Sequence, residues 1–225
     1  MGSLWATLAP FIIASALMPV ELVITLALLG TPGRVRTASA AVAGTVVVRL
    51  LQGLLFGAIL HWGRRDDTPG GHGWLVSSVV LVVGVVLLTT AIREILGGGD
   101  PDDPPPKWMA ALTSMKPGKA FLLGGATVII SVKLWVFTLA AMSAIGDAGM
   151  PRSANFATYT AFVLLGVSTH LAIIAAAAFF PDRSRAFLDR SLLWLQNHNR
   201  VIMIGLGLVI GGWFLIKGLH GFGIV

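Results

Sequence analysis

The chain has 225 residues, of which 56% are hydrophobic and 12% are charged, and its mean hydropathy is +0.85. A water-soluble domain carries roughly twice that share of charged residues, so the composition excludes a soluble globular domain and predicts a membrane protein. Spans of about 20 apolar residues with short connections leave room for about six helices. Because an open sheet cannot satisfy its backbone in lipid, we expect an all-α integral membrane protein.

The net charge of +6 does not indicate nucleic-acid binding, because the basic residues are scattered beside apolar runs and form no basic stripe. Membrane topology and anionic lipid headgroups explain them better. The absence of cysteine excludes disulfides and thiolate metal sites. An aspartate cluster at 100–103 is interleaved with proline and indicates a solvated linker, so we expect neither a metal site nor a cofactor.

Six apolar runs follow one another along the chain, and each is long enough to cross a bilayer. They cover residues 4–29, 38–62, 74–96, 120–145, 154–180 and 201–219. Before the last run, residues 182–197 place apolar side chains on one helical face, which predicts a short helix in the membrane interface. Residues 97–117 are rich in proline and aspartate and predict a flexible linker between two halves, 1–96 and 118–225.

The two halves align when one is shifted over the other by 112 residues (133 minus 21), which places Glu21 on Lys133. Each of these charges interrupts an otherwise apolar run. Three spans in each half is an odd number, so the two halves must enter the membrane in opposite senses. The sequence therefore predicts a three-plus-three inverted repeat, with a polar site where the halves meet.

The distribution of lysine and arginine predicts the orientation of the spans. Ten of these residues lie around the connections that follow the first, third and fifth runs, and four lie on the other side. The positive-inside rule places the richer side in the cytoplasm. We therefore expect a multi-pass protein of the inner (plasma) membrane with both termini outside the cytoplasm.

Three charged residues inside the apolar runs are candidates for a functional site: Glu21, Arg49 and Lys133. A charge at the bilayer centre costs about 2.5–3.5 kcal/mol on insertion scales, so it needs a partner or a water-filled cavity. If Glu21 neutralises one cation, the other is left to attract an anionic substrate. The alternative is a buried ion network that only fixes helix packing. Arg49 is also long enough to snorkel toward a thinned bilayer.

Pro19, Ser131 and His170 complete the candidate substrate-binding or gating residues. Pro19 removes a backbone donor, which predicts either a broken helix of the kind that lines transporter sites or a simple kink. His170 has the chemistry to relay protons or bind substrate, although a lone histidine in a membrane is more often a packing or hydrogen-bonding residue. No recognised nucleophile constellation surrounds it, so we do not expect an enzyme.

Three short motifs resemble those of the LysE superfamily of small six-span transporters. They are Met18-Pro19-Val20-Glu21 in the first run, Lys116-Pro117-Gly118-Lys119 before the fourth, and Ser131-Val132-Lys133 where the family typically has Asn-Pro-Lys. In the third motif, Lys133 is the residue that matches. The resemblance covers nearly the whole chain and is greatest to the actinobacterial glycopeptidolipid-addressing and sulfolipid-addressing proteins.

The resemblance implies export, of amino acids or cations in some branches and of surface glycolipids in the actinobacterial branch. We therefore expect an inner-membrane exporter that aids export of a cell-envelope glycolipid or another anionic or amphipathic substrate. The alternative is a non-transporting accessory subunit of a larger lipid-export or biosynthesis complex. Membrane lipids are the expected partners in both cases, and a larger lipid exporter or a second copy of the chain are further ones.

Overall fold

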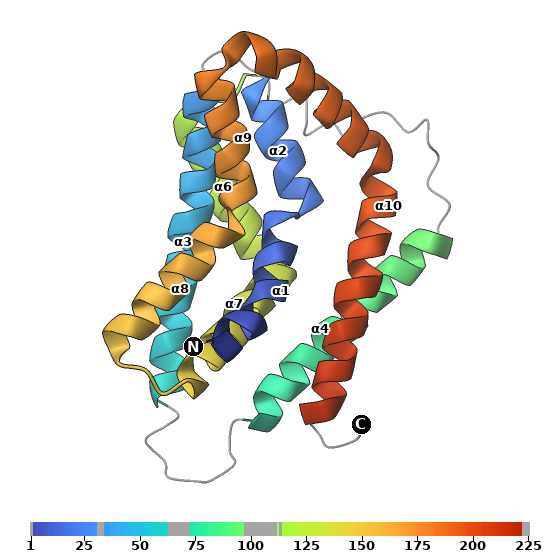
Figure 1. Ribbon diagram of the computed structural model, residues 1–225. Helices are drawn as coiled ribbons and strands as arrows, with labels where there is room; N and C mark the ends of the chain where they lie inside the picture. Colours follow the sequence, from blue (N-terminus) through green and yellow to red (C-terminus); the bar gives the residue numbers. More distant parts are fainter. Residues whose placement is uncertain (1, 31–33, 63–72, 97–111, 113, 222–225) are drawn as a thin grey trace.

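A computed structural model describes residues 2–30, 34–62, 73–96, 112 and 114–221 of the chain. Every element within these ranges is a helix, so the all-α prediction is confirmed for the part that is described (Figure 1). The elements are α1 (Gly2–Ala16), α2 (Pro19–Leu29), α3 (Arg34–Trp62), α4 (Gly73–Leu96), α6 (Pro117–Ile130), α7 (Val132–Asp147), α8 (Arg152–Gly166), α9 (Ser168–Phe179) and α10 (Pro181–Gly221). In Figure 1, α1 begins and α10 ends at the lower end of the molecule.

Three of the predicted spans are pairs of helices that meet at a sharp bend. The bend is 47° between α1 and α2, 72° between α6 and α7, and 55° between α8 and α9. Among the described residues, the stretch Arg34–Gly57 of α3 is long and apolar enough to cross a membrane as one helix. Up to four spans result if each bent pair counts as one, so six spans and the inverted repeat stay predictions.

The first bend has its cause in the sequence. Proline has no N–H to donate to the preceding turn, and it pushes the residue before it out of the helical region. Accordingly, Met18 is extended at φ −62° and ψ 114°, and α2 starts at Pro19. The predicted interruption of the first apolar run at Pro19 is therefore a broken helix.

The second bend occurs without a proline. Ser131 is extended at φ −79° and ψ 96°, where it ends α6 and precedes α7. The break leaves carbonyl groups of α6 without helical partners, and the indole N–H of Trp135 donates to two of them, those of Val128 (3.1 Å) and Ile129 (3.0 Å). One side chain of α7 thus satisfies backbone acceptors that lipid could not.

The interfacial helix and the last span form one helix, α10, which is 41 residues long. The prediction of two separate helices is therefore wrong, because neither proline nor glycine occurs within 182–204 to interrupt the helical hydrogen bonds. Figure 1 shows α10 running across the top of the bundle and then turning down beside α4. The side chains of Phe187, Leu188 and Leu192, on the predicted lipid face, lie outside the described residues.

Two close helix pairs, α3 with α6 and α4 with α10, hold much of the structure together. A Cβ atom on Gly44 of α3 would collide with the carbonyl oxygen of Phe121 on α6. A Cβ atom on Gly84 of α4 would lie 2.6 Å from the backbone nitrogen of Leu215 on α10. Such glycines let backbones approach closely in lipid, where dispersion replaces the hydrophobic effect as the attraction between helices.

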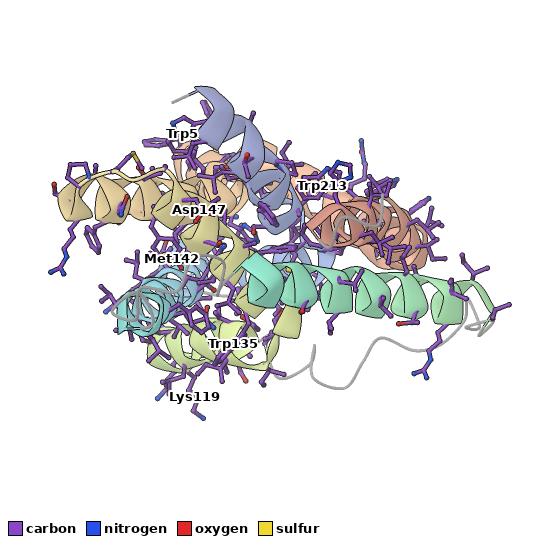
Figure 2. All side chains as sticks on the ribbon, turned by 90° about the horizontal axis from the view of Figure 1, so that it is seen from below. Trp5, Lys119, Trp135, Met142, Asp147 and Trp213 are labelled. Atoms are coloured by element: carbon purple, nitrogen blue, oxygen red, sulfur yellow. The ribbon has the colours of Figure 1, made fainter. Side chains whose placement is uncertain are left out.

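An aromatic cluster joins the lower half of α10 to the first broken span. The ring of Phe11 on α1 stacks on Phe214 of α10 with centroids 5.1 Å apart, and it meets Trp213 and Phe137 edge-on at 5.5 and 5.9 Å. Figure 2 shows Trp213 on the side of α10 that faces α1. Buried rings in these arrangements fix the position of α10 against α1 and α7.

Candidate functional site

A small cavity lies between α2, α3, α6 and α9. Its polar lining consists of Glu21, Thr25, Thr45, Thr127 and His170. The volume is about 20 Å³, which is room for about one water molecule. Two residues that the sequence singled out, Glu21 and His170, therefore line the same cavity although 149 positions separate them in the chain (170 minus 21).

The break at Pro19 places Glu21 in the cavity wall. Glu21 lies in the first turn of α2, where the positive end of the helix dipole favours a carboxylate. Its backbone carbonyl accepts a hydrogen bond of 3.0 Å from the hydroxyl of Thr25. Within the described part of the chain no salt bridge shorter than 4.0 Å reaches its carboxylate, and the cation that acts on it electrostatically is Arg49.

The opposite wall of the cavity offers hydrogen-bond acceptors. The hydroxyls of Thr45 and Thr127 both donate to the carbonyl oxygen of Gly124, at 3.1 and 2.7 Å. Each hydroxyl uses its single proton in this bond and retains acceptor lone pairs. Gly124 is required here, because a Cβ atom on it would collide with the carbonyl oxygen of Ala41 on α3.

His170 is the third residue of α9, within its first turn, and is only 3% exposed. Neither of its ring nitrogens has a hydrogen-bond partner among the described residues. Leaving such a buried group unsatisfied costs about 1–3 kcal/mol, so a water molecule in the adjoining cavity is the expected partner. Both interpretations of His170 stay predictions, and the structure adds that no hydrogen bond to another described residue holds its ring.

Arg49 is buried rather than snorkelling, since it is only 1% exposed. Its Nη2 donates to the hydroxyl of Ser15 at 3.4 Å, and its Cζ lies 5.2 Å from the ring centroid of Phe162, in a cation–π contact. Its backbone carbonyl accepts a hydrogen bond of 2.7 Å from the hydroxyl of Tyr159. The guanidinium is therefore held by residues of α1 and α8 inside the helix bundle.

Two helices that end at a break, α1 and α8, meet at Arg49. Ser15 is next to last in α1, and Gly166 is the last residue of α8. A Cβ atom on Gly166 would lie 2.9 Å from Nη1 of Arg49 and 3.2 Å from Cβ of Ser15. The first and third breaks therefore enclose the same guanidinium group.

A protein-family model described as Sap, sulfolipid-1-addressing protein, matches residues 8–220, a range that includes all three breaks, the cavity and Arg49. The chain belongs to the sulfolipid-1-addressing protein family. The resemblance to sulfolipid-addressing proteins that the short motifs indicated is thereby confirmed at the level of this family. No curated protein and no solved structure matches the chain.

In this Sap-family protein Lys133 is not brought into an ion pair with Glu21. Lys133 is the second residue of α7, directly after the break at Ser131, and it is partly buried. Among the described residues no salt bridge within 4.0 Å joins it to a carboxylate, and Glu21 is coupled electrostatically to Arg49 instead. The alignment of Glu21 with Lys133 therefore identified two breaks whose positions agree to within one residue, whereas no ion pair joins the two side chains among the described residues.

A polar layer that the sequence did not predict as a unit lies beside Arg49 in this Sap-family protein. Besides Arg49 it comprises Ser15, Gln52, Thr138 and Tyr159, from four different helices. The Thr138 hydroxyl donates to Oε1 of Gln52 at 3.5 Å, and the Gln52 Nε2 has no partner among the described residues. Gln52 follows Arg49 by one turn and was visible in sequence, whereas single polar residues such as Tyr159 carry no pattern that would single them out.

Proposed function

We propose that this protein is an inner-membrane exporter, or an export factor, for an anionic glycolipid of the cell envelope. Two findings support the proposal: the family is described as sulfolipid-1-addressing, and the chain has apolar helices suited to a membrane. The observation that carries it is the burial of the Arg49 guanidinium where the breaks of two spans meet. An intramembrane cation at helix breaks is typical of a substrate pathway.

Arg49 has the chemistry that an anionic headgroup needs. A guanidinium binds sulfate or phosphate oxygens through two parallel N–H donors, and the Nε of Arg49 has no partner within the described part of the chain. Ser15 and Gly166 cover the guanidinium in this conformation. We propose that movement at the breaks beside Pro19 and Gly166 uncovers it, with Glu21 as the countercharge that releases the headgroup again.

The second break supplies the other half of the proposed pathway. Lys133 follows Ser131 at the start of α7, where its ammonium group adds a second cation to the membrane interior. In the proposed mechanism Lys133 attracts the headgroup without a tight ion pair of its own. This assigns Ser131 to the hinge and Lys133 to the passage of the anion.

A specific observation favours a second candidate function, that of an accessory subunit. The cavity of about 20 Å³ is far too small for a glycolipid headgroup, which is several times larger than the one water molecule that fits. In an accessory subunit the breaks and the buried charge would serve assembly with a larger exporter. The two candidate functions differ in whether the purified protein moves lipid alone.

A strain that lacks the gene distinguishes these functions. We expect anionic glycolipids to accumulate in the cell pellet and to be depleted in surface extracts, as measured by mass spectrometry. Wild-type protein restores the surface pool, Arg49→Gln does not, and Arg190→Gln on the exposed side of α10 does. An unchanged surface pool in the deletion strain would refute both functions, while loss in the strain without lipid movement in vesicles holding the purified protein would favour the accessory subunit.

We further propose six spans in a three-plus-three inverted repeat of the LysE-superfamily type, with both termini outside the cytoplasm. The breaks support the repeat, because the extended residues before α2 and α7, Met18 and Ser131, are 113 positions apart (131 minus 18), within one position of the shift that aligns Glu21 with Lys133. Because the chain has no cysteine, Ala148→Cys and Lys116→Cys each introduce a single reporter at an exposed position. Labelling of position 148 only from outside and of position 116 only from inside is expected, and the reverse pattern would overturn the orientation.

A further inference from the structure

Glu21 and His170 face one cavity from two helices, and neither is used as a binding group by the anion pathway proposed above. Both nitrogens of His170 are buried without a partner among the described residues. The carboxylate of Glu21 lacks a salt bridge within 4.0 Å in the same part of the chain. A buried imidazole whose nitrogens are left without partners is costly unless something occupies the space beside it, and Glu21 lines that same space.

The size and the lining of the cavity restrict what that occupant is. About 20 Å³ admits one water molecule and excludes any organic ligand. The hydroxyls of Thr45 and Thr127 present acceptor lone pairs, because their protons are directed to Gly124. An occupant that donates hydrogen bonds to the threonines and exchanges protons with the carboxylate and the imidazole fits all of these groups.

We propose that Glu21 and His170 form a proton-binding site, in which one proton is exchanged between the carboxylate and a ring nitrogen through the water in the cavity. The inference rests on the proposed export function and adds its coupling ion, which is a proton. It also gives a role to the break at Pro19, since that break starts α2 and so brings Glu21 to the cavity.

The exchange balances in atoms and charge. The O–H bond of the Glu21 carboxyl group breaks and its proton passes to the water, while another O–H bond of that water breaks and an N–H bond forms on His170. A neutral acid and a neutral imidazole become a carboxylate and an imidazolium, and the water is regenerated. No oxidant or further reactant takes part, and either arrangement stores the same single proton.

The charged groups around the pair make the site sensitive to an anion. Of the described residues, Arg49 on α3 acts electrostatically on both Glu21 and His170, and Tyr159 on α8 acts on Arg49. The wall from α6 adds the neutral groups of Gly124 and Thr127. With its proton absent, the site together with Arg49 is neutral, and with the proton bound it carries one positive charge. An anionic headgroup at Arg49 therefore strengthens proton binding, and the proton strengthens headgroup binding by the same factor.

A metal cation is the competing occupant. Hard cations prefer a shell made entirely of oxygen atoms, which the two free nitrogens of His170 do not provide. Among the described residues no group of three or more metal-binding side chains comes together. The chemistry of the lining thus favours a proton, and sodium becomes an outcome that the experiment must be able to detect.

The test is infrared difference spectroscopy of the purified full-length protein in lipid nanodiscs while the pH is stepped, in H₂O and in D₂O. We expect the carboxyl and imidazole bands of the wild type to change together. Glu21→Gln should remove the carboxyl band, and Glu21→Asp should keep it. His170→Gln should remove the imidazole change and move the midpoint of the carboxyl band by about one pH unit, a tenfold change in proton affinity.

Matched controls come from groups outside the cavity. His198→Gln changes an exposed histidine of α10 whose Nδ1 donates to the carbonyl of Trp194 at 2.8 Å, and Asp147→Asn changes an exposed carboxylate at the end of α7. Both should leave the two bands of the cavity as in the wild type. Only variants that elute as a single peak in size-exclusion chromatography are compared. If Glu21→Gln does not fold, Glu21→Asp is compared with the wild type in its place.

Three results would overturn the proton site. They are a carboxyl band that survives in Glu21→Gln, an unchanged midpoint in His170→Gln, and a titration that moves when sodium chloride replaces choline chloride, which would show a metal-ion site. The readout does not depend on lipid export. If surface glycolipid is unchanged in the deletion strain while the spectra behave as expected, the export function fails and the proton site stands.

Discussion

The first and second helix breaks each have one extended residue before the new helix, but their surroundings are very different. Met18 and Ser131 are both extended, at ψ 114° and 96°, and each precedes a new helix after one bend. At the first break, a residue of α1 bonds to the buried charge of Arg49, and α2 supplies Glu21 to a cavity. At the second break, the indole N–H of Trp135 donates to the freed carbonyls of Val128 and Ile129, so residues of the same broken span satisfy them.

The comparison teaches that a broken span does not by itself make a site. Each break frees backbone acceptors, and in lipid these acceptors need partners. When one aromatic side chain provides these partners, as Trp135 does at the second break, neighbouring residues stabilise the bend without help from other helices. When charged groups from other helices gather at the break, the bend connects elements whose relative movement alters a buried charge. The predictions below change one break or the other and compare the effects.

The largest expected effect is that of Arg49→Met compared with Lys133→Met. Removing one charge of a buried set leaves Glu21 without its compensating cation, which lowers the free energy of unfolding by about 3 kcal/mol. Lys133 is partly buried and its replacement should cost less than about 1 kcal/mol. Denaturant titration of both variants in detergent micelles measures the two losses.

The double variant Glu21→Gln with Arg49→Met separates a structural charge pair from a functional one. Stability should recover toward the wild-type value, because neither charge is left unpaired. Export should stay absent if Arg49 binds the headgroup. A double variant that is both well folded and fully active would show that these charges only hold helices together. Equal losses in the Arg49 and Lys133 single variants would show that the two breaks do not differ as described.

A smaller effect is expected from Gly166→Ala, at the break that shares Arg49 with the first one. The added Cβ atom would lie 2.9 Å from Nη1 of Arg49, so the guanidinium or α8 must move, at a cost of about 1–3 kcal/mol. Gly118→Ala on α6 is the matched control, since nothing lies within 4 Å of its Cβ position. Thermal unfolding followed by size-exclusion chromatography compares them, and equal melting temperatures would contradict the close contact at Arg49.

The smallest effect should come from Trp135→Phe at the second break. The ring contact with Phe56 at 5.7 Å is largely kept, while the carbonyls of Val128 and Ile129 lose their donor. The expected loss is about 0.5–1.5 kcal/mol of unfolding free energy with export retained. Loss of export at unchanged stability would mean that the second break takes part in the site as directly as the first.

How far the sequence predicted the structure depends on which physical signal each break carries. Pro19 has no backbone N–H to donate and therefore predicts the first break. The apolar composition predicts an all-helical membrane protein. Ser131 was singled out by the resemblance of Ser131-Val132-Lys133 to a family motif, because serine by itself does not force an extended backbone. The break at Val167 was not predicted, since Gly166 beside it is an ordinary packing residue until Arg49 is placed against it.

The site was predicted in part for a similar reason. Placing a charge in the membrane interior costs free energy, so charged residues in apolar runs are candidates for a site. This argument identified Glu21 and Arg49. Which charges meet depends on how helices cross, and no one-dimensional pattern contains that information. Thus the expected contact between Glu21 and Lys133 is absent from the described part of the structure, and the contribution of Ser15 to Arg49 could not be foreseen.

The unbroken course of α10 has a mechanical consequence. A helix of 41 residues measures about 60 Å along its axis, and α10 changes direction over the top of the bundle with neither proline nor glycine between residues 182 and 204 (Figure 1). The first part of α10 lies over the bundle (Figure 1), and its last part holds Phe214 against Phe11 of α1. Because α10 is one continuous helix, we expect a displacement of its first part to reach α1, whose last turn contains Ser15, the hydrogen-bond partner of Arg49 on α3.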